Sequence, residues 1–552
     1  MSTRVGRPFG YALLAGSLGA CVVWLGPPGS DLAAHVYQRA FFLKSGFSLW
    51  NNYWYAGRYS FVTYSVLYYP LAAVVGIKLL ATASVAAGAG AFGLIVEREW
   101  GRVARWAAWA FAVALATSVL SAAFPYVLGV AFALVALAAL QSRRFKTFGG
   151  FVAATFCASP LAFVLLLVVL AAALARSRRL LVKAVVPVAA IGFVAGVLWR
   201  LFPGSGRFPF SLAELVGALL FCAAGIVFSW RVERARLLLY VFAVYAVFCL
   251  LCYVIPSEIG ANIVRLRFVA VPIMALTLSL RRWKPLLPGL AVFGLALAWN
   301  VTPLAYSYAR SASDPSSLQA FWAPAIGFLR GHASPSYRVE AVDTTGHWEA
   351  DYLPAAGIPL VRGWFRQDDF PNNALLYDPT LGRASYMRWL RKMAVRYVVL
   401  TTAPADYSSQ SEALLLRSGR SRLPVVFRGT DITIFAVPSP QPIVTGPGRP
   451  RVITMRDSSI TIDVQRAGTY RLALRYTPYW SAPGACIAQT SDGMISLQAR
   501  RAGRIQLNFA VTATDALTTL FGAGTQCSAL SPGGVSLRHG GGGRSPHHRL
   551  IG

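Results

Sequence analysis

Long apolar runs separated by short polar joints occupy roughly the first three hundred positions of the chain. A helix needs about 20 consecutive apolar residues to cross a bilayer. Runs that reach or approach this length lie at about 10–27, 71–96, 106–122, 124–140, 148–175, 184–202, 211–229, 236–255, 263–280 and 285–303. The pattern predicts a polytopic α-helical membrane bundle.

The run at 148–175 does not fit a single crossing, because basic clusters lie at both of its ends. Ser159-Pro160 lies near its middle, and a proline inside a helix interrupts the backbone hydrogen bonds. Either a hairpin of two short helices or a re-entrant loop would return the chain to its starting side. Counted as a hairpin, this run brings the bundle to about eleven helices.

The joints between the runs alternate in charge. Joints around 122–125, 203–210 and 256–262 carry little charge, whereas the others are rich in Arg and Lys, at 97–105, 143–146, 176–183, 231–236 and 281–284. Basic loops of plasma-membrane proteins remain in the cytoplasm. The first run ends in Gly-Pro-Pro-Gly-Ser without a small-x-small cleavage site, so it reads as an uncleaved helix with a cytoplasmic N-terminus. Residues 304–552 are therefore expected outside the cell membrane.

The first outer loop, residues 28–70, is unusually long. It contains an amphipathic helical segment, Leu32 to Lys44, and is dense in Trp and Tyr. These aromatic side chains favour the membrane–water interface. We expect the loop to lie along the outer surface of the membrane.

The composition changes near residue 305, where strand and turn patterns replace the apolar runs. Residues 305–440 predict an extracytoplasmic α/β domain, with a buried strand at 395–401 and helices at 384–393 and 408–418. Short alternating strands over 441–525 predict a β-sandwich-like domain, and residues 526–552 read as a disordered tail. Together with the transmembrane domain, 1–304, these segments divide the whole chain.

A net charge of +31 accompanies a mean hydropathy of +0.52 and 56% hydrophobic residues. The basic clusters lie between apolar runs and not beside stacking aromatics, so nucleic acid is excluded as a partner. The scarcity of Lys beside Arg favours a bacterial source. Cys486 and Cys527 are the only cysteines of the C-terminal region, and outside the membrane they could pair. The chain contains no P-loop, GxSxG, HExxH or dinucleotide fingerprint.

Six acidic residues fall within 1–304, and Asp31 is the one without an ordinary account. Three share inner loops with arginines, Glu214 begins an outer-leaflet helix, and Glu258 lies in a short outer joint. Asp31 follows the first helix at the outer boundary, and His35 lies on the same side one turn later. Asp31 is either a helix N-cap beside a satisfied histidine, or a general base or metal-linked carboxylate.

A long first outer loop that opens with an acid, many helices and a C-terminal outer domain resemble the GT-C class of membrane glycosyltransferases. Asp31-x-x-x-His35, the stretch Trp50 to Gly57 and Tyr68-Tyr69-Pro70-Leu71 are more closely similar to bacterial membrane proteins with the historical name of 6-pyruvoyl-tetrahydropterin synthase-related proteins. The segments HWEADYLP (347–354) and RGWFRQDD (362–369) resemble the outer domain of that group. We infer no pterin chemistry from the name.

The GT-C resemblance implies a polyprenyl-phosphate-linked sugar donor, a cell-envelope glycan as acceptor, and Asp31 as the base that acts on the acceptor hydroxyl. His35 stands where many of these enzymes have a second acid, which leaves a divalent metal cofactor undecided. Arg58, Arg265 and Arg267 are placed to bind the donor phosphate, with interfacial snorkelling as the alternative. Candidates for glycan binding, which structural salt bridges would explain equally well, are His347, Glu349, Arg362, Trp364, Arg366 and Asp368.

Two other classes of function remain open. A transporter or flippase for a lipid-linked envelope precursor would show similarly interrupted helices in two halves, whereas only 148–175 is broken here. A non-catalytic scaffold would bind envelope glycan through its β-rich region. A cavity at the outer boundary lined by Asp31 favours the enzyme, and a path across the midplane favours the transporter.

Overall fold

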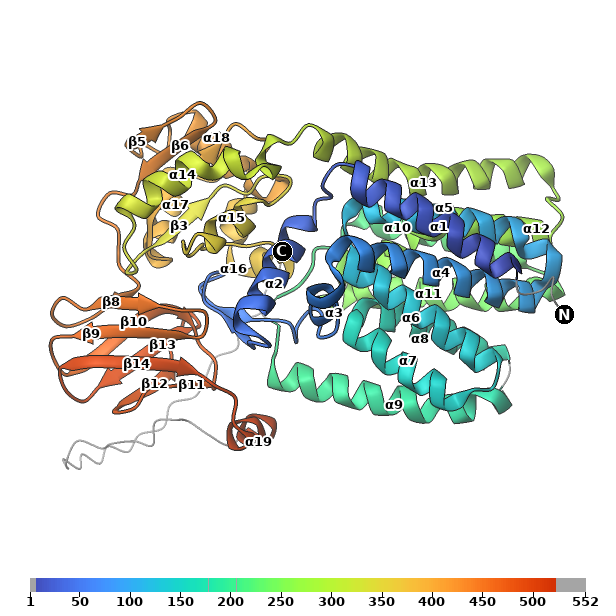
Figure 1. Cartoon of the computed structure of the whole chain (residues 1–552), viewed down its shortest axis with the longest axis horizontal. Helices are drawn as coiled ribbons and strands as arrows, with labels where there is room; N and C mark the ends of the chain where they lie inside the picture. The colour runs from blue at the N-terminus through green and yellow to red at the C-terminus, as the bar shows by residue number, and fades with distance from the viewer. Residues whose placement is uncertain (1–5, 177, 205, 523–552) are drawn as a thin grey trace, which may run out of the picture.

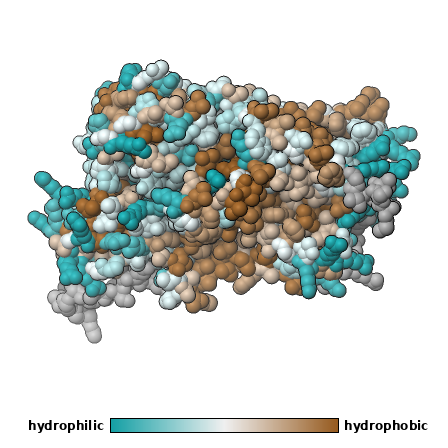
Figure 2. All heavy atoms as spheres, viewed as in Figure 1, coloured by the Kyte–Doolittle hydropathy of each residue, from teal (hydrophilic) through white to brown (hydrophobic). Residues whose placement is uncertain are grey.

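The computed structural model describes residues 6–176, 178–204 and 206–522. An α-helical bundle forms one half of the molecule, and an α/β domain and a β-sandwich lie together at one end of it (Figure 1). Hydrophobic side chains cover the middle of the bundle, whereas hydrophilic ones gather at its far end and over the C-terminal domains (Figure 2). The chain is a polytopic membrane protein with strand-rich C-terminal domains.

Eleven apolar helices build the bundle within the described residues. Eight helical stretches are long and apolar enough to cross a membrane, one of which, 77–121, contains two of the helices. Small residues let the helices approach closely: a Cβ added at Gly93 would lie 2.2 Å from the ring of Tyr11. The helices are α1 (Gly6–Leu25), α4 (Ile77–Trp100), α5 (Arg105–Ser118), α6 (Phe124–Gln141), α7 (Phe145–Ala158), α8 (Pro160–Arg176), α9 (Arg178–Leu201), α10 (Leu212–Ser229), α11 (Arg236–Val254), α12 (Ala270–Leu280) and α13 (Leu286–Ala312).

Basic joints of the bundle meet at one end. The Trp100 indole N–H donates to the carbonyl of Arg234 at 2.7 Å, and a guanidinium N–H of Arg98 donates to the hydroxyl of Ser142 at 2.9 Å. The joints of low charge meet at the opposite end, which carries the C-terminal domains (Figure 1). The separation of basic and weakly charged joints predicted from the sequence is present in the fold.

The predicted break at Ser159-Pro160 is a hairpin of two short helices, α7 and α8, and not a re-entrant loop. The backbone N–H groups of Val66 and Leu67 both donate to the carbonyl of Cys157 at 2.9 Å. This places the turn of the hairpin against the first outer loop.

Most aromatic side chains of the first outer loop are buried inside the protein, contrary to the prediction that the loop lies along the membrane surface; residues 43–47 remain exposed. Trp50, Trp54 and Tyr55 are no more than 2% exposed. The loop fills the space between the bundle and the C-terminal domains, and the indole N–H of Trp54 donates to the carbonyl of Ala350 at 2.9 Å. Its aromatics pack against protein because the outer domains cover them. Its elements are α2 (Leu32–Ser45), β1 (Trp50–Asn51), β2 (Arg58–Tyr59) and α3 (Tyr68–Val75).

The α/β domain has a four-stranded sheet in the order β3-β4-β6-β5, in which β3 runs parallel to β4 and the other pairs are antiparallel. Val398 and Leu400 of β4 face α17 and α18, whereas Tyr397 and Val399 face α14 and α15. The domain contains β3 (Arg338–Ala341), β4 (Val395–Thr401), β5 (Val425–Arg428), β6 (Ile432–Ala436), α14 (Gln319–His332), α15 (Glu349–Ala355), α16 (Arg366–Asn372), α17 (Arg383–Lys392) and α18 (Gln410–Arg417).

The β-sandwich packs the sheet β12-β13-β10-β7 against the sheet β11-β14-β9-β8. Alternate residues of β9 are buried, as expected of a strand with one covered face. Cys486 lies on β12, but Cys527 and the expected tail 526–552 fall outside the described residues. The elements are β7 (Val444–Thr445), β8 (Arg451–Met455), β9 (Ser459–Val464), β10 (Gly468–Arg475), β11 (Trp480–Ser481), β12 (Ala485–Gln489), β13 (Met494–Ala499), β14 (Gly503–Phe509) and α19 (Ala513–Phe521).

Candidate functional site

A cavity of about 550 Å³ lies where the bundle, the first outer loop and the α/β domain meet. A neighbouring cavity of about 480 Å³ shares Asp31, Arg265, Arg267 and Arg366 with it, so the two form one region. Each part of the chain contributes polar side chains to the main cavity, among them Asp31, Tyr64, Glu258, Arg265, Arg267, Tyr306, Arg310, His347, Trp364, Arg366, Asp406 and Tyr407.

Asp31 lies between α1 and α2, where its backbone N–H donates to the carbonyl of Ser121 at 3.2 Å. Asp31 occupies the N-cap position of α2, but its side chain makes no capping hydrogen bond, so the structure does not support the capping alternative. Among the described residues, the hydrogen-bond donor to the carboxylate is the hydroxyl of Ser30, at a long distance of 3.5 Å. Burial raises the pKa of Asp31, against the opposing charges of Arg265, His347 and Arg366. Asp31 is therefore a carboxyl group of raised pKa in a cavity that Arg265, His347 and Arg366 also line.

Arg265 and Arg267 lie on η5 (Gly260–Val269), the short helix that leads into α12. Nε of Arg265 donates to the side-chain oxygen of Asn262 at 3.2 Å, and Nε of Arg267 has no hydrogen-bond partner. Among the described residues, neither guanidinium forms an ion pair with a carboxylate within 4.0 Å. The two arginines therefore offer free hydrogen-bond donors to an anion in the cavity.

His35 does not line the cavity with Asp31, because it lies behind the wall. The ring is fully buried among aromatic side chains, and Nδ1 lies 3.2 Å from the hydroxyl of Tyr69. Tyr64 and Trp364, whose rings lie 6.3 and 6.0 Å from the imidazole, separate it from the cavity space. Burial lowers the pKa of His35 to about 3, so the ring is neutral at physiological pH. Its position is that of a core histidine.

Arg58 and Asp368 are paired with each other away from the main cavity. Nε of Arg58 donates to Asp368 at 2.7 Å, and the guanidinium lies 3.6 Å from the ring centroid of Phe365. Both residues line a separate cavity of about 430 Å³, next to the β-sandwich. The pair joins the first outer loop to α16, and the structure does not bring Arg58 together with Arg265 and Arg267.

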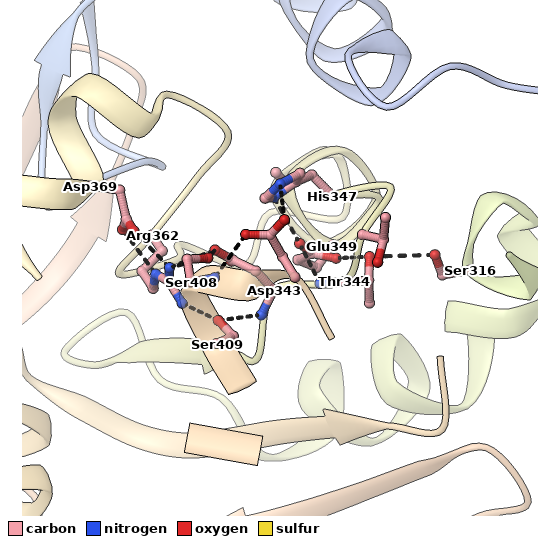
Figure 3. A network of polar contacts seen from close by, with 12 residues as sticks. Ser316, Asp343, Thr344, His347, Glu349, Arg362, Asp369, Ser408 and Ser409 are labelled. Atoms are coloured by element: carbon pink, nitrogen blue, oxygen red, sulfur yellow. Dashed lines mark hydrogen bonds and ion pairs between the residues drawn. The ribbon is translucent and has the colours of Figure 1, made fainter. Parts of the chain in front are cut away.

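Of the remaining candidates for glycan binding, His347, Trp364 and Arg366 line the main cavity, whereas Glu349 and Arg362 do not. Arg362 is buried and bridges Asp343 at 2.7 Å and Asp369 at 2.6 Å (Figure 3). This network fixes the loop after β3 to α16.

The carboxyl ends of β3 and β4 supply residues that sequence reasoning missed. Asp343 follows β3, and Asp406 and Tyr407 follow β4. Because β3 and β4 are parallel, the loops at their carboxyl ends lie side by side, which is the edge where α/β sheets bind ligands. Asp406 accepts from Arg366 at 2.9 Å, and the Arg366 guanidinium lies 4.1 Å from the ring centroid of Tyr407. The sequence signal that could have identified Asp406 and Tyr407 was an acidic and aromatic loop directly after a predicted buried strand.

Asp343, His347 and Glu349 form a buried group that could hold a metal ion, since one potential ligand atom from each lies within 4.8 Å of the others. Burial lowers the pKa of His347, but the neighbouring carboxylates of Glu349, Asp406 and Asp343 raise it to about 9. Burial raises the pKa of Asp343 to about 8, although Arg362 opposes this effect. The group holds more acidic than basic side chains.

No family model matches the chain. No curated protein matches it either. Among solved structures, the chain is similar to arabinofuranosyltransferase AftD from Mycobacteria, determined by single-particle cryo-EM, with a TM-score of 0.45 and 15% sequence identity. The match covers 83% of this chain and 41% of that one, so this chain spans about two fifths of the length of AftD. The resemblance to the 6-pyruvoyl-tetrahydropterin synthase-related proteins stays a prediction.

Proposed function

We propose that this protein is a membrane glycosyltransferase that transfers a sugar from a polyprenyl phosphate to a cell-envelope glycan on the outer face of the membrane. The observation that carries the proposal is the environment of Asp31. Its carboxylate has no capping role and opens into a cavity lined by Arg265, His347 and Arg366. Asp31 makes no capping hydrogen bond to α2, and among the described residues Arg265 beside it forms no ion pair. A carboxylate in this setting suits a base that acts next to an anionic leaving group.

The proposed reaction uses these groups in one displacement. The acceptor hydroxyl oxygen attacks the anomeric carbon as its proton passes to the Asp31 carboxylate. The bond between the anomeric carbon and the phosphate oxygen breaks, and the polyprenyl phosphate leaves with the electron pair. Arg265 and Arg267 donate hydrogen bonds to the phosphate oxygens and stabilise the charge that develops there. Attack from the face opposite the phosphate inverts the anomeric configuration.

The position of α13 supports a lipid-linked donor. The outer end of this helix lines the cavity through Pro303, Tyr306 and Arg310. Deeper in the same helix, Leu297 and Val301 are exposed on the apolar surface of the bundle. A polyprenyl chain in the bilayer could therefore lie against α13 while its phosphate enters the cavity.

The same arrangement supports different binding roles for the three domains. Residues 1–304, with the loop 28–70, would bind the donor, and residues 305–440 would hold the acceptor through His347, Trp364 and Arg366. The 441–525 domain would contact more distant parts of the polymer. The cavity lies at the end of the bundle that meets the C-terminal domains, which favours the enzyme over a transporter.

Binding of a polyprenyl phosphate tests the donor site without knowledge of the sugar. We expect Arg265→Gln and Arg267→Gln each to weaken binding about tenfold or more, because a hydrogen bond between charged groups contributes roughly 1.5–3 kcal/mol. The measurement is a titration of the detergent-solubilised protein with polyprenyl phosphate, followed by native mass spectrometry. Arg102→Gln, exposed at the opposite end of the bundle, is the control and should bind as wild type. Equal affinities for all three variants would contradict the proposed donor site.

A further inference from the structure

We infer that Asp343, His347 and Glu349 bind a divalent transition-metal ion in the wall of the cavity that contains Asp31. Asp343 and His347 lie in the short segment that joins β3 to α15, Glu349 is the first residue of α15, and all three are buried. Nδ1 of His347 lies 3.5 Å from Oε1 of Glu349. Two ligands of one tetrahedral ion with bonds near 2.1 Å stand about 3.4 Å apart, so this pair is already spaced for coordination.

A buried ring nitrogen without a hydrogen bond gives independent support for a ligand. His347 is 6% exposed, and its Nδ1 makes no hydrogen bond. Buried polar atoms are nearly always paired, so an unpaired ring nitrogen between carboxylates needs an explanation. Its contact with Oε1 of Glu349 is an ion pair at 3.5 Å when the imidazole is protonated, a distance beyond an ordinary N–H···O hydrogen bond. The nitrogen points into the group of potential ligands (Figure 3).

Both carboxylates are held from behind, as metal-ligating carboxylates usually are. The backbone N–H and the hydroxyl of Thr344 donate to the two oxygens of Glu349, at 3.2 and 2.7 Å. Oδ2 of Asp343 forms an ion pair with Arg362 at 2.7 Å and accepts a hydrogen bond from the hydroxyl of Ser408 at 3.3 Å. These contacts fix the orientation of each carboxylate.

The local charge also favours a cation. Carboxylates of Asp343, Glu349 and Asp406 surround the imidazole, and the nearby arginines are already engaged: Arg362 with Asp369 and Arg366 with Asp406. One imidazole with two carboxylates suits Zn²⁺ or Mn²⁺ better than Ca²⁺ or Cu⁺, which prefer oxygen or sulfur donors. Since His347 lines the cavity, the ion would add positive charge to the wall where an anionic substrate binds.

The test is a titration of the full-length protein with Mn²⁺ alone, after chelator treatment, with free Mn²⁺ followed by electron paramagnetic resonance. His547 and His548 are replaced by alanine in every sample, because adjacent histidines bind metal ions by themselves. We expect one site per chain in the wild type. His347→Gln and Glu349→Gln should each weaken binding at least about tenfold. His332→Gln, which removes an exposed histidine elsewhere in the α/β domain, is the matched control and should leave binding unchanged.

Two measurements keep the inference open to refutation. Pulsed electron paramagnetic resonance of the wild type should show modulation from one imidazole nitrogen, which needs no variant to fold. The inference is wrong if the wild type binds no Mn²⁺ beyond the His347→Gln level, or if the modulation is absent; His347 is then a protonated imidazole between carboxylates. The inference rests on the proposed function only for the role of the ion. Asp31→Asn should retain the metal site, so loss of sugar transfer in that variant and loss of metal binding are separate results.

Discussion

Glu258 lies in the loop between α11 and η5, where it lines the main cavity. A Cβ added at Gly204 would lie 1.5 Å from its carboxylate oxygen, so the backbone at Gly204 packs directly against the carboxylate. This burial raises the pKa of Glu258 to about 7, with a further increase from Asp368 and a decrease from Arg58. Arg265 and Arg267 of η5 line the same cavity.

The raised pKa predicts a stability that depends on pH. The folded protein binds the proton of Glu258 more tightly than the unfolded chain, so stability is lost as pH rises from about 4.5 through about 7. Glu258→Gln removes this loss and should be the more stable form at pH 8, on the order of 2 kcal/mol, with little gain at pH 5. The midpoint of thermal unfolding at both pH values measures it. Glu233→Gln, exposed at the other end of the bundle, should show no pH-dependent gain; a gain for Glu258→Gln that is equal at pH 5 and pH 8 would contradict the assignment.

The residue types in the sequence indicated the chemistry of this site, but they did not indicate how its side chains are arranged. The position of Asp31 after an apolar run predicted a carboxylate at the outer boundary. Whether Asp31 caps α2 could be decided only from the structure, because a side chain in the N-cap position can point toward the helix or away from it. The sequence spacing placed His35 one turn from Asp31. The burial of His35 depends on tyrosines of α3, and the spacing of two residues on α2 says nothing about the position of α3.

At the scale of elements, helix positions followed from apolar periodicity, and the proline at 160 marked the hairpin of α7 and α8. The fate of the loop 28–70 could not be predicted in the same way. Its Trp and Tyr residues suit a membrane interface and a protein interior equally, and the choice depends on whether a later domain covers them. Trp54 is buried because α15, nearly three hundred residues further along the chain, packs over it.

The contact of β3 with β4 is a second case. Parallel pairing joins strands that are separated by more than fifty residues, and no local signal specifies it. Once the pairing is known, the meeting of the loops that contain Asp343 and Asp406 follows directly, because parallel strands end at the same edge. The contributions of Asp343 and Asp406 were therefore hidden from the sequence until the topology was known, whereas His347, Trp364 and Arg366 were already candidates.

At the scale of the whole molecule, the basic joints and the C-terminal domains occupy opposite ends of the bundle. Since basic joints remain in the cytoplasm, the C-terminal domains and the cavity should face outward. A cysteine introduced in the β5–β6 turn, Gly429→Cys, should react with a membrane-impermeant maleimide in intact cells. Arg102→Cys, exposed at the basic end, should react only after the membrane is permeabilised. The reverse pattern of labelling would place the cavity on the cytoplasmic side and would contradict a reaction on the outer face of the membrane.

The most direct measurement of the proposed function is the rate of sugar transfer by Asp31→Asn. The substitution keeps the size of the side chain and breaks no capping bond, so the variant should fold with the thermal stability of the wild type and bind polyprenyl phosphate. Without a base for the acceptor hydroxyl, transfer from a panel of radiolabelled polyprenyl-phosphate sugars to envelope glycan should fall by at least about a hundredfold. Glu233→Gln serves as the control for an exposed acid at the opposite end. Transfer by Asp31→Asn at the wild-type rate would contradict the role of Asp31 and, with it, the glycosyltransferase assignment.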